Sequence, residues 1–157
     1  MRYFFIDRIL EYKQGESAKA VKNITLSEDI FDDHFPDLPI YPGAYLIESA
    51  AQLGGFLVEM TVNKPEVISR AMMGQVDQAK FYRAAEPGDQ LLLEACLENI
   101  MEDAAKICVH ISCSGTKVAR VFLTFILKRI DNLRIHEQRR SLYTLWTKHI
   151  EDFPEIL

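Results

Sequence analysis

The feature of this sequence that most constrains its fold is an apolar run at residues 44–60. Projected on a helix, the run places apolar side chains on nearly every side, and its charged residues are Glu48 and Glu59. A helix of this kind has to be surrounded by other structure, and a membrane span rarely carries two acidic side chains. The run therefore predicts a long helix buried inside a domain. Pro42 and Gly43 open it, since proline is tolerated in the first helical turn.

The segments on both sides of this helix have the residue types and turn signals of β-strands. Two strands are expected before it, at residues 2–12 and 17–25, followed by a proline-stiffened loop at residues 28–41. After the helix, strands are expected at residues 67–73, 78–83, 90–99, 105–114 and 117–130. This order predicts an α+β domain in which one antiparallel sheet wraps around the long central helix.

The last part of the chain returns to a helical spacing of apolar side chains. Residues 134–150 place four of them on one stripe, namely Leu142, Leu145, Trp146 and Ile150. We expect an amphipathic helix that packs on the body of the protein or serves as a docking surface. The chain is accordingly divided into a domain at residues 1–131 and a C-terminal helical extension at residues 132–157.

Length and charge narrow the class of protein. A chain of 157 residues suits one domain. Its net charge of -5 argues against a nucleic-acid partner, because such binding needs a basic face. The N-terminus becomes charged too early for a signal peptide. The three cysteines are Cys96, Cys108 and Cys113, and their spacing is not that of a metal site. We expect them to be buried, reduced thiols. We expect a cytoplasmic protein without a membrane span or a metal site.

His34 and Glu48 are the residues best suited to acid–base chemistry. His34 lies in the proline-stiffened loop, and its imidazole can accept a proton near neutral pH. Glu48 lies in the second turn of an apolar helix, where partial desolvation favours the protonated carboxyl group. A base and an acid are what the elimination of water across adjacent carbons requires. Gly43 adds a backbone N–H at the positive end of the helix, where it can stabilise a developing oxyanion.

These residues belong to a longer pattern that resembles a known family. The chain has His-Phe-Pro at residues 34–36, Pro-x-x-Pro-Gly at 39–43 and Glu-Ser-Ala-Ala-Gln at 48–52. A second block has Lys-Phe-Tyr-Arg at 80–83 and Pro-Gly-Asp-Gln-Leu at 87–91. Both are similar to the hot-dog-fold (3R)-3-hydroxyacyl-[acyl-carrier-protein] dehydratases of fatty-acid synthesis. Two blocks in the right order make the resemblance specific.

The resemblance implies a role for each motif residue. His34 would remove the C2 proton of the substrate, and Glu48 of the other protomer would protonate the departing C3 hydroxyl, with no cofactor. Gly43 would bind the thioester oxygen, and Phe35 and Gln52 would also contact the substrate. The spacing of four residues between Glu48 and Gln52 predicts a hydrogen bond that fixes the carboxylate. The assembly would be a homodimer or a trimer of dimers.

The substrate would arrive on the phosphopantetheine of an acyl carrier protein. Four basic residues could form a rim that receives this acidic partner, namely Lys80, Arg83, Lys117 and Arg120. Alternatively, they could lie on an ordinary solvated strand edge. Met72 and Met73 could be core residues or could line an acyl tunnel, and core is the prediction. Two other functions remain open at this point. One is a hot-dog acyl thioesterase, in which Glu48 activates water, and the other is a non-catalytic acyl-thioester-binding subunit.

Overall fold

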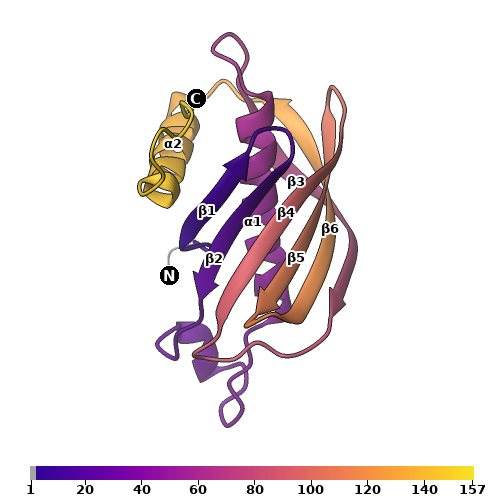
Figure 1. Ribbon diagram of the computed structural model, residues 1–157, viewed down its shortest axis with the longest axis vertical. Helices are drawn as coiled ribbons and strands as arrows, with labels where there is room; N and C mark the ends of the chain where they lie inside the picture. The colour runs from indigo at the N-terminus through magenta and orange to yellow at the C-terminus, as the bar shows by residue number, and fades with distance from the viewer. Residues whose placement is uncertain (1–2) are drawn as a thin grey trace.

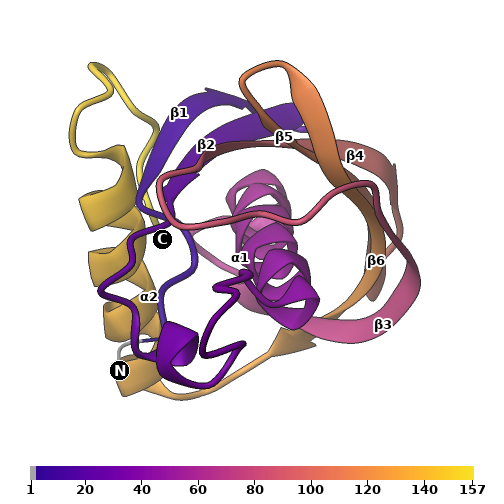
Figure 2. The ribbon, with the colours of Figure 1, turned by 90° about the horizontal axis from the view of Figure 1, so that it is seen from below.

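The computed structural model describes residues 3–157 of the chain. The elements follow one another as β1 (Arg8–Lys13), β2 (Ser17–Asn23), the short 3-10 helix η1 (Asp29–Asp32), α1 (Gly43–Val62), β3 (Ser69–Phe81), β4 (Gln90–Ile100), β5 (Ala104–Cys113), β6 (Thr116–Arg129) and α2 (Leu133–Thr147). The strands form one antiparallel sheet of order β1-β2-β4-β5-β6-β3. This sheet curls around α1, so the predicted α+β hot-dog fold is confirmed (Figures 1 and 2).

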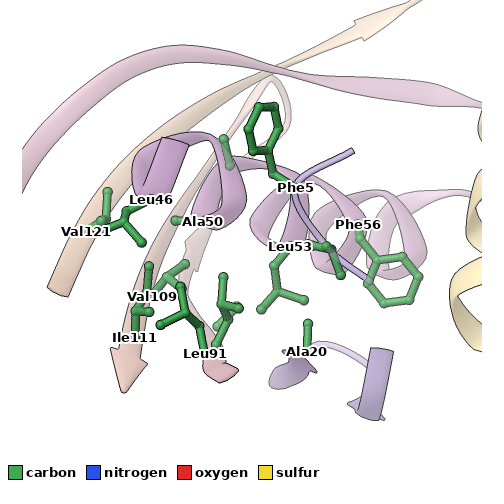
Figure 3. Close-up of a cluster of buried hydrophobic side chains, with 14 of the residues drawn as sticks. Phe5, Ala20, Leu46, Ala50, Leu53, Phe56, Leu91, Val109, Ile111 and Val121 are labelled. Carbon is green, nitrogen blue, oxygen red and sulfur yellow. The ribbon is translucent and has the colours of Figure 1, made fainter. Parts of the chain in front are cut away.

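The core lies between α1 and the concave face of the sheet. Leu53 and Phe56 of α1 are fully buried, and they face inward-pointing side chains such as Leu91 and Val109 (Figure 3). Each large apolar side chain buried in this way contributes about 1.5–3 kcal/mol relative to exposure. Gly54 permits a close approach of α1 to β6, because a Cβ there would lie 3.0 Å from Cε2 of Phe125. The apolar side chains on nearly every face of the helix are thus explained by its place inside the sheet.

The structure corrects the prediction of two strands between residues 67 and 83. These residues form the single strand β3, whose register with β6 shifts between Met73 and Gln75. Gly74 stands at this bulge, where a Cβ would meet Cγ1 of Ile126 at 2.8 Å. The glycine therefore marks a bulge inside a strand rather than its end, since a strand glycine often permits close backbone approach.

The two ends of the chain also differ from the sequence prediction. The first strand begins at Arg8 rather than at residue 2, which lies outside the described residues. In the described segment before it, the Gln52 side chain of α1 holds the backbone of Tyr3 and Phe5, and only Asp7, next to the strand, donates to β2, at Val21 O. The C-terminal helix is confirmed, but it ends at Thr147, and residues 148–157 continue without regular structure apart from a turn.

Helix α2 packs against the outside of the domain beside β1 (Figures 1 and 2). Trp146 and Tyr143 are buried, and the Tyr143 ring meets the Phe56 ring edge-on, with ring centroids 4.9 Å apart. Leu145, from the predicted apolar stripe, is half exposed. The helix therefore covers the body of the protein, as one of the two sequence expectations proposed.

Two further expectations are settled by burial. Cys108 and Cys113 are buried, whereas Cys96 is exposed, so the prediction of buried thiols is wrong for that residue. Met72 and Met73 are about half exposed, so neither belongs to the core. Within residues 3–157, no helix is both long and apolar enough to cross a bilayer.

Candidate active site

The His34 loop is held by buried aromatic residues and by its own backbone hydrogen bonds. Phe31 and Tyr41 are buried on either side of it. The His34 N–H donates to Ile30 O at 3.0 Å, and the Ile40 N–H donates to His34 O at 3.1 Å. Burial, and then the charge of Glu28, raise the pKa of the Tyr41 phenol. Tyr41 therefore stays neutral and serves as an anchor for the loop.

One hydrogen bond fixes the protonation pattern of the His34 ring. Its Nδ1 lies 2.9 Å from the carbonyl oxygen of Ile40. A carbonyl can only accept, so Nδ1 carries the hydrogen, and in the neutral ring Nε2 then has a free lone pair. The half-buried ring stacks on Phe35, with centroids 4.4 Å apart, and Phe35 itself is half exposed. In the neutral ring the loop thus holds Nε2 in a defined orientation, with its lone pair able to accept a hydrogen bond.

Glu48 is half-buried on α1, and Gln52 holds it. The Gln52 Nε2 donates to Glu48 Oε1 at 2.9 Å, which is the hydrogen bond predicted from the four-residue spacing. The amide of Gln52 is fixed in turn by the N-terminal segment. Its Oε1 accepts from the Phe5 N–H at 2.9 Å, and its Nε2 also donates to Tyr3 O at 3.2 Å. Gln52 is therefore an oriented donor for one carboxylate oxygen of Glu48.

Tyr3 is a neighbour of Glu48 that the sequence reasoning missed. Desolvation, followed by the charge of Glu48 and a hydrogen bond to it, raises the pKa of the Tyr3 phenol. The segment containing Tyr3 is apolar and aromatic, which made it resemble part of a strand. No local pattern in the sequence indicates that it returns to a helix more than forty residues away.

Gly43 lies at the start of α1 with free backbone donors beside it. Within residues 3–157, neither the Gly43 N–H nor the Ala44 N–H donates a hydrogen bond, and the cap residue Pro42 has no side-chain acceptor. A Cβ at Gly43 would lie 3.1 Å from Cζ of Phe81, so a side chain there would displace that ring. Two free N–H groups at the positive end of a long helix can stabilise an oxyanion.

A groove of about 130 Å³ leads away from Glu48 along α1. It is formed between α1, β3, β6 and α2, on the side where the sheet leaves α1 uncovered (Figure 2). Met73 lines this groove, in agreement with the second of the two roles considered for it, a position along an acyl tunnel. Half of the residues that line the groove are apolar or glycine, and a short alkyl segment can lie against them between the polar residues.

His34 and Glu48 do not meet within one chain. No hydrogen bond or ion pair in the described part of the chain joins them, and His34 is not among the residues that line the groove. Gly43, Glu48 and Gln52 share one helix, whereas His34 and Phe35 belong to the loop before it. The predicted site residues are thus divided between α1 and the loop that precedes it.

The predicted basic rim is only partly continuous. Lys80 and Arg120 are cross-strand neighbours on β3 and β6. Arg83 is 3.1 Å from Asp89 and is neutralised by it. Lys117 and Arg120 line a hollow on the outer face of the sheet. Three of the four predicted cations thus remain available on the surface.

Comparison with known proteins agrees with these observations. The profile of the FabA-like domain family matches residues 1–121. The 3-hydroxyacyl-[acyl-carrier-protein] dehydratase FabZ of Listeria monocytogenes serotype 4b is 32% identical over 126 residues, which cover 80% of this chain and 85% of that one. The FabZ of Pectobacterium atrosepticum is 39% identical over 92 residues, covering 59% and 61%. The chain therefore belongs to the FabA-like family, and its relatives identify it as a dehydratase.

Solved structures of similar fold come from more distant proteins. A Streptococcus mutans protein bound to acetyl CoA superimposes with a TM-score of 0.66 at 15% identity, covering 84% of this chain and 96% of that one. The PaaI protein of the Escherichia coli phenylacetic acid degradation operon has a TM-score of 0.61 at 15% identity, covering 76% and 81%. At this identity the likeness concerns the fold.

Proposed function

We propose that the protein dehydrates (3R)-3-hydroxyacyl thioesters to trans-2-enoyl thioesters, with the acyl chain carried by an acyl carrier protein. The observation that carries this proposal is the hydrogen bond from His34 Nδ1–H to Ile40 O, which leaves Nε2 as a base. A thioesterase that used Glu48 to activate water would have no need of this oriented imidazole. Family membership and the relatives named above support the same reaction.

The proposed reaction is a balanced elimination. His34 Nε2 takes a proton from C2 of the substrate, and the negative charge that develops on the thioester oxygen is stabilised by the Gly43 N–H. The protonated carboxyl group of Glu48 gives its proton to the C3 hydroxyl, which leaves as water while the C2–C3 double bond forms. Gln52 acts as a positioning residue for Glu48 through its 2.9 Å hydrogen bond. Phe35 contacts the substrate beside His34.

We further propose that the site is completed in a homodimer formed through β3. This strand is at the edge of the sheet, so its outer backbone groups are unpaired. It exposes apolar side chains along its length, namely Met72, Met73, Val76 and Phe81. Long apolar edge strands need a cover, and a second copy of β3 would continue the sheet. His34 of one protomer would then face Glu48 of its partner.

The oligomeric state is tested by light scattering after size exclusion. We expect the mass of two chains, or of six if dimers form a trimer of dimers, and Val76→Lys on the β3 edge should shift the protein toward monomer with loss of activity. Lys13→Glu on the opposite edge strand is the matched surface control. A monomeric active wild type would refute the shared site.

The carrier protein is proposed to dock at Lys80, Lys117 and Arg120. Lys80→Glu is expected to raise KM for carrier-bound substrate several-fold, because a surface charge mainly affects encounter with a charged partner. The same substrate on coenzyme A should be far less affected. Lys13→Glu, on the far edge of the sheet, is the control. Equal effects of Lys80→Glu on both substrates would argue against docking here.

The reaction itself is tested by following enoyl absorbance together with free thiol. The proposal predicts enoyl formation from 3-hydroxyacyl substrates without release of thiol. Release of thiol from an acyl thioester that lacks the 3-hydroxyl would indicate a thioesterase. Binding of ligand without any turnover would indicate a non-catalytic subunit.

A further inference from the structure

The groove that begins at Glu48 follows one face of α1. Glu48, Gln52, Gly55 and Glu59 are spaced by four, three and four residues, so they lie on a single stripe. Eleven residues of helix separate the two glutamates, which corresponds to about 16 Å. The groove thus has a catalytic end at Glu48 and a far end at Glu59.

Apart from Gln52, the residues that line the groove between these ends carry no polar side chain. Ala51 and Gly55 contribute from α1, Ala71 and Met73 from β3, and Phe125 from β6. The Gln52 amide is already engaged in hydrogen bonds to Glu48, Phe5 and Tyr3. A methylene chain can therefore lie along this stretch without leaving a polar group unpaired.

The far end is polar and is contributed by α2. Glu59 is buried, and its Oε2 accepts from Arg70 at 2.9 Å and from the Tyr143 hydroxyl at 3.0 Å. The Nε of Arg139 lies 3.8 Å from the same oxygen, and its guanidinium lies 5.8 Å from the Tyr143 ring centroid. An alkyl tail pushed against Arg139 would desolvate a charged group and offer no hydrogen bond in return.

The size of the groove sets a limit as well. Its volume is about 130 Å³, and an apolar cavity of about 150 Å³ accepts benzene. The groove therefore has room for a short alkyl segment rather than a long one. Because Glu48 would act at C3 of the substrate, the distal carbons of a long acyl chain would reach the far end of the groove.

We infer that Arg139 and Tyr143 form the end wall of the acyl groove and make α2 a determinant of chain length. This inference rests on the proposed function. Helix α2 lies beyond residues 1–121, which the family profile matches. Arg139 also borders an apolar hollow on α2 lined by Ile135, Leu142 and Leu145. Shortening Arg139 would join the groove to this hollow and admit longer chains.

The test compares kcat/KM for carrier-bound 3-hydroxyacyl substrates of six and twelve carbons. The wild type is expected to prefer six carbons by at least tenfold. Arg139→Ala should raise the ratio of the twelve-carbon to the six-carbon value at least tenfold. Arg140→Ala is the matched control, since Arg140 is exposed on the same helix and lines neither the groove nor the hollow. Its ratio should equal that of the wild type.

A second variant, Gly55→Ala, changes the wall of the groove that α1 forms. A Cβ at Gly55 would have Cε1 of Phe125 at 3.7 Å as its nearest neighbour, which is an ordinary contact. Alanine also favours a helix by up to about 1 kcal/mol over glycine, so Gly55→Ala should fold. Its added methyl narrows the groove, and the twelve-to-six ratio should fall at least threefold.

The outcomes separate the two levels of the proposal. If the wild type dehydrates no 3-hydroxyacyl thioester, the proposed function is wrong. If the wild type is a dehydratase but neither Arg139→Ala nor Gly55→Ala changes the ratio, the end wall is wrong and the function stands. Should Arg139→Ala fail to fold, Gly55→Ala alone decides, since an unchanged ratio overturns the inference.

Discussion

Two glutamates on the same face of α1 have opposite environments. Glu48, near the start of the helix, is half-buried, and its side-chain partners are the Gln52 amide and the Tyr3 phenol. Glu59, near the end, is buried and is surrounded by donors: Arg70, Tyr143 and the Ala71 N–H hydrogen-bond to it, and Arg139 lies 3.8 Å away. The two carboxyl groups belong to one helix, but Glu59 has more hydrogen-bond donors held next to it than Glu48 has.

The difference indicates what each carboxylate can do. Glu59 is ionised and fully paired, because burying a carboxylate is tolerated only with such partners. Its oxygens are occupied, so it has no capacity for a substrate. Glu48 borders the groove and has no cation paired with it among the described residues, so its carboxyl group can exchange a proton with a ligand. An acidic residue inside an apolar helix is thus a site candidate when its partners leave it incomplete, and a structural residue when they saturate it.

The largest expected effect is the loss of turnover when Glu48 or His34, the proposed acid and base, is replaced. Glu48→Gln and His34→Ala should each lower kcat by on the order of a hundredfold or more, since general acid–base catalysis contributes 10²–10⁴-fold. Thermal unfolding should show that both variants remain folded. Near-normal dehydration by either variant would contradict the assigned roles.

Replacing Glu59, whose carboxyl group is fully hydrogen-bonded, should affect stability much more than replacing Glu48 does. Glu59→Ala leaves the Arg70 guanidinium buried without its partner, and breaking a buried pair costs about 3–5 kcal/mol. Urea unfolding should detect this loss, while Glu48→Ala should change the free energy of unfolding by no more than about 1 kcal/mol. Equal destabilisation by the two substitutions would remove the contrast between the two ends of α1.

A smaller effect on kcat is expected at Gln52, which orients the carboxyl group of Glu48. Gln52→Ala should lower kcat about tenfold, equivalent to about 1.4 kcal/mol, and should shift the pH profile of kcat because Glu48 loses its donor. Asn at this position is too short to reach Glu48, so it should not restore the rate. A loss of stability with an unchanged pH profile would show that Gln52 only ties down the N-terminal segment.

The smallest effect concerns Asp89, a surface carboxylate paired with a cation. Burial opposes its ionisation, but the Glu86 N–H and the Arg83 guanidinium outweigh it and lower the pKa of Asp89. Its stabilisation is therefore present above the unfolded-state pKa of about 3.9 and disappears as the pH falls through the lower folded-state value. Asp89→Asn should cost about 1 kcal/mol at pH 7 and nothing near pH 2, as measured by urea unfolding at both pH values. A constant difference would show that the charge is irrelevant.

Sequence patterns predicted those parts of the fold that depend on local periodicity. The all-round apolar helix required an enclosing sheet, and the pairing of Glu48 with Gln52 followed from helical spacing. They failed where the decisive contact is distant in sequence. Gly74 could not be identified as a bulge without Ile126 of the neighbouring strand. Likewise, the contact of Tyr3 with Glu48, and the saturation of Glu59 by residues of β3 and α2, exist only once the chain has folded.

The proposed sharing of one site between two chains is tested most directly by mixing two inactive variants. His34→Ala and Glu48→Gln chains are unfolded together, refolded as a mixture and assayed for enoyl formation. In a two-fold dimer with sites built across the interface, half of the dimers are mixed and each mixed dimer has one intact site, so about a quarter of wild-type activity should return. A mixture that forms mixed dimers and remains inactive would show that His34 and Glu48 do not act together across two chains.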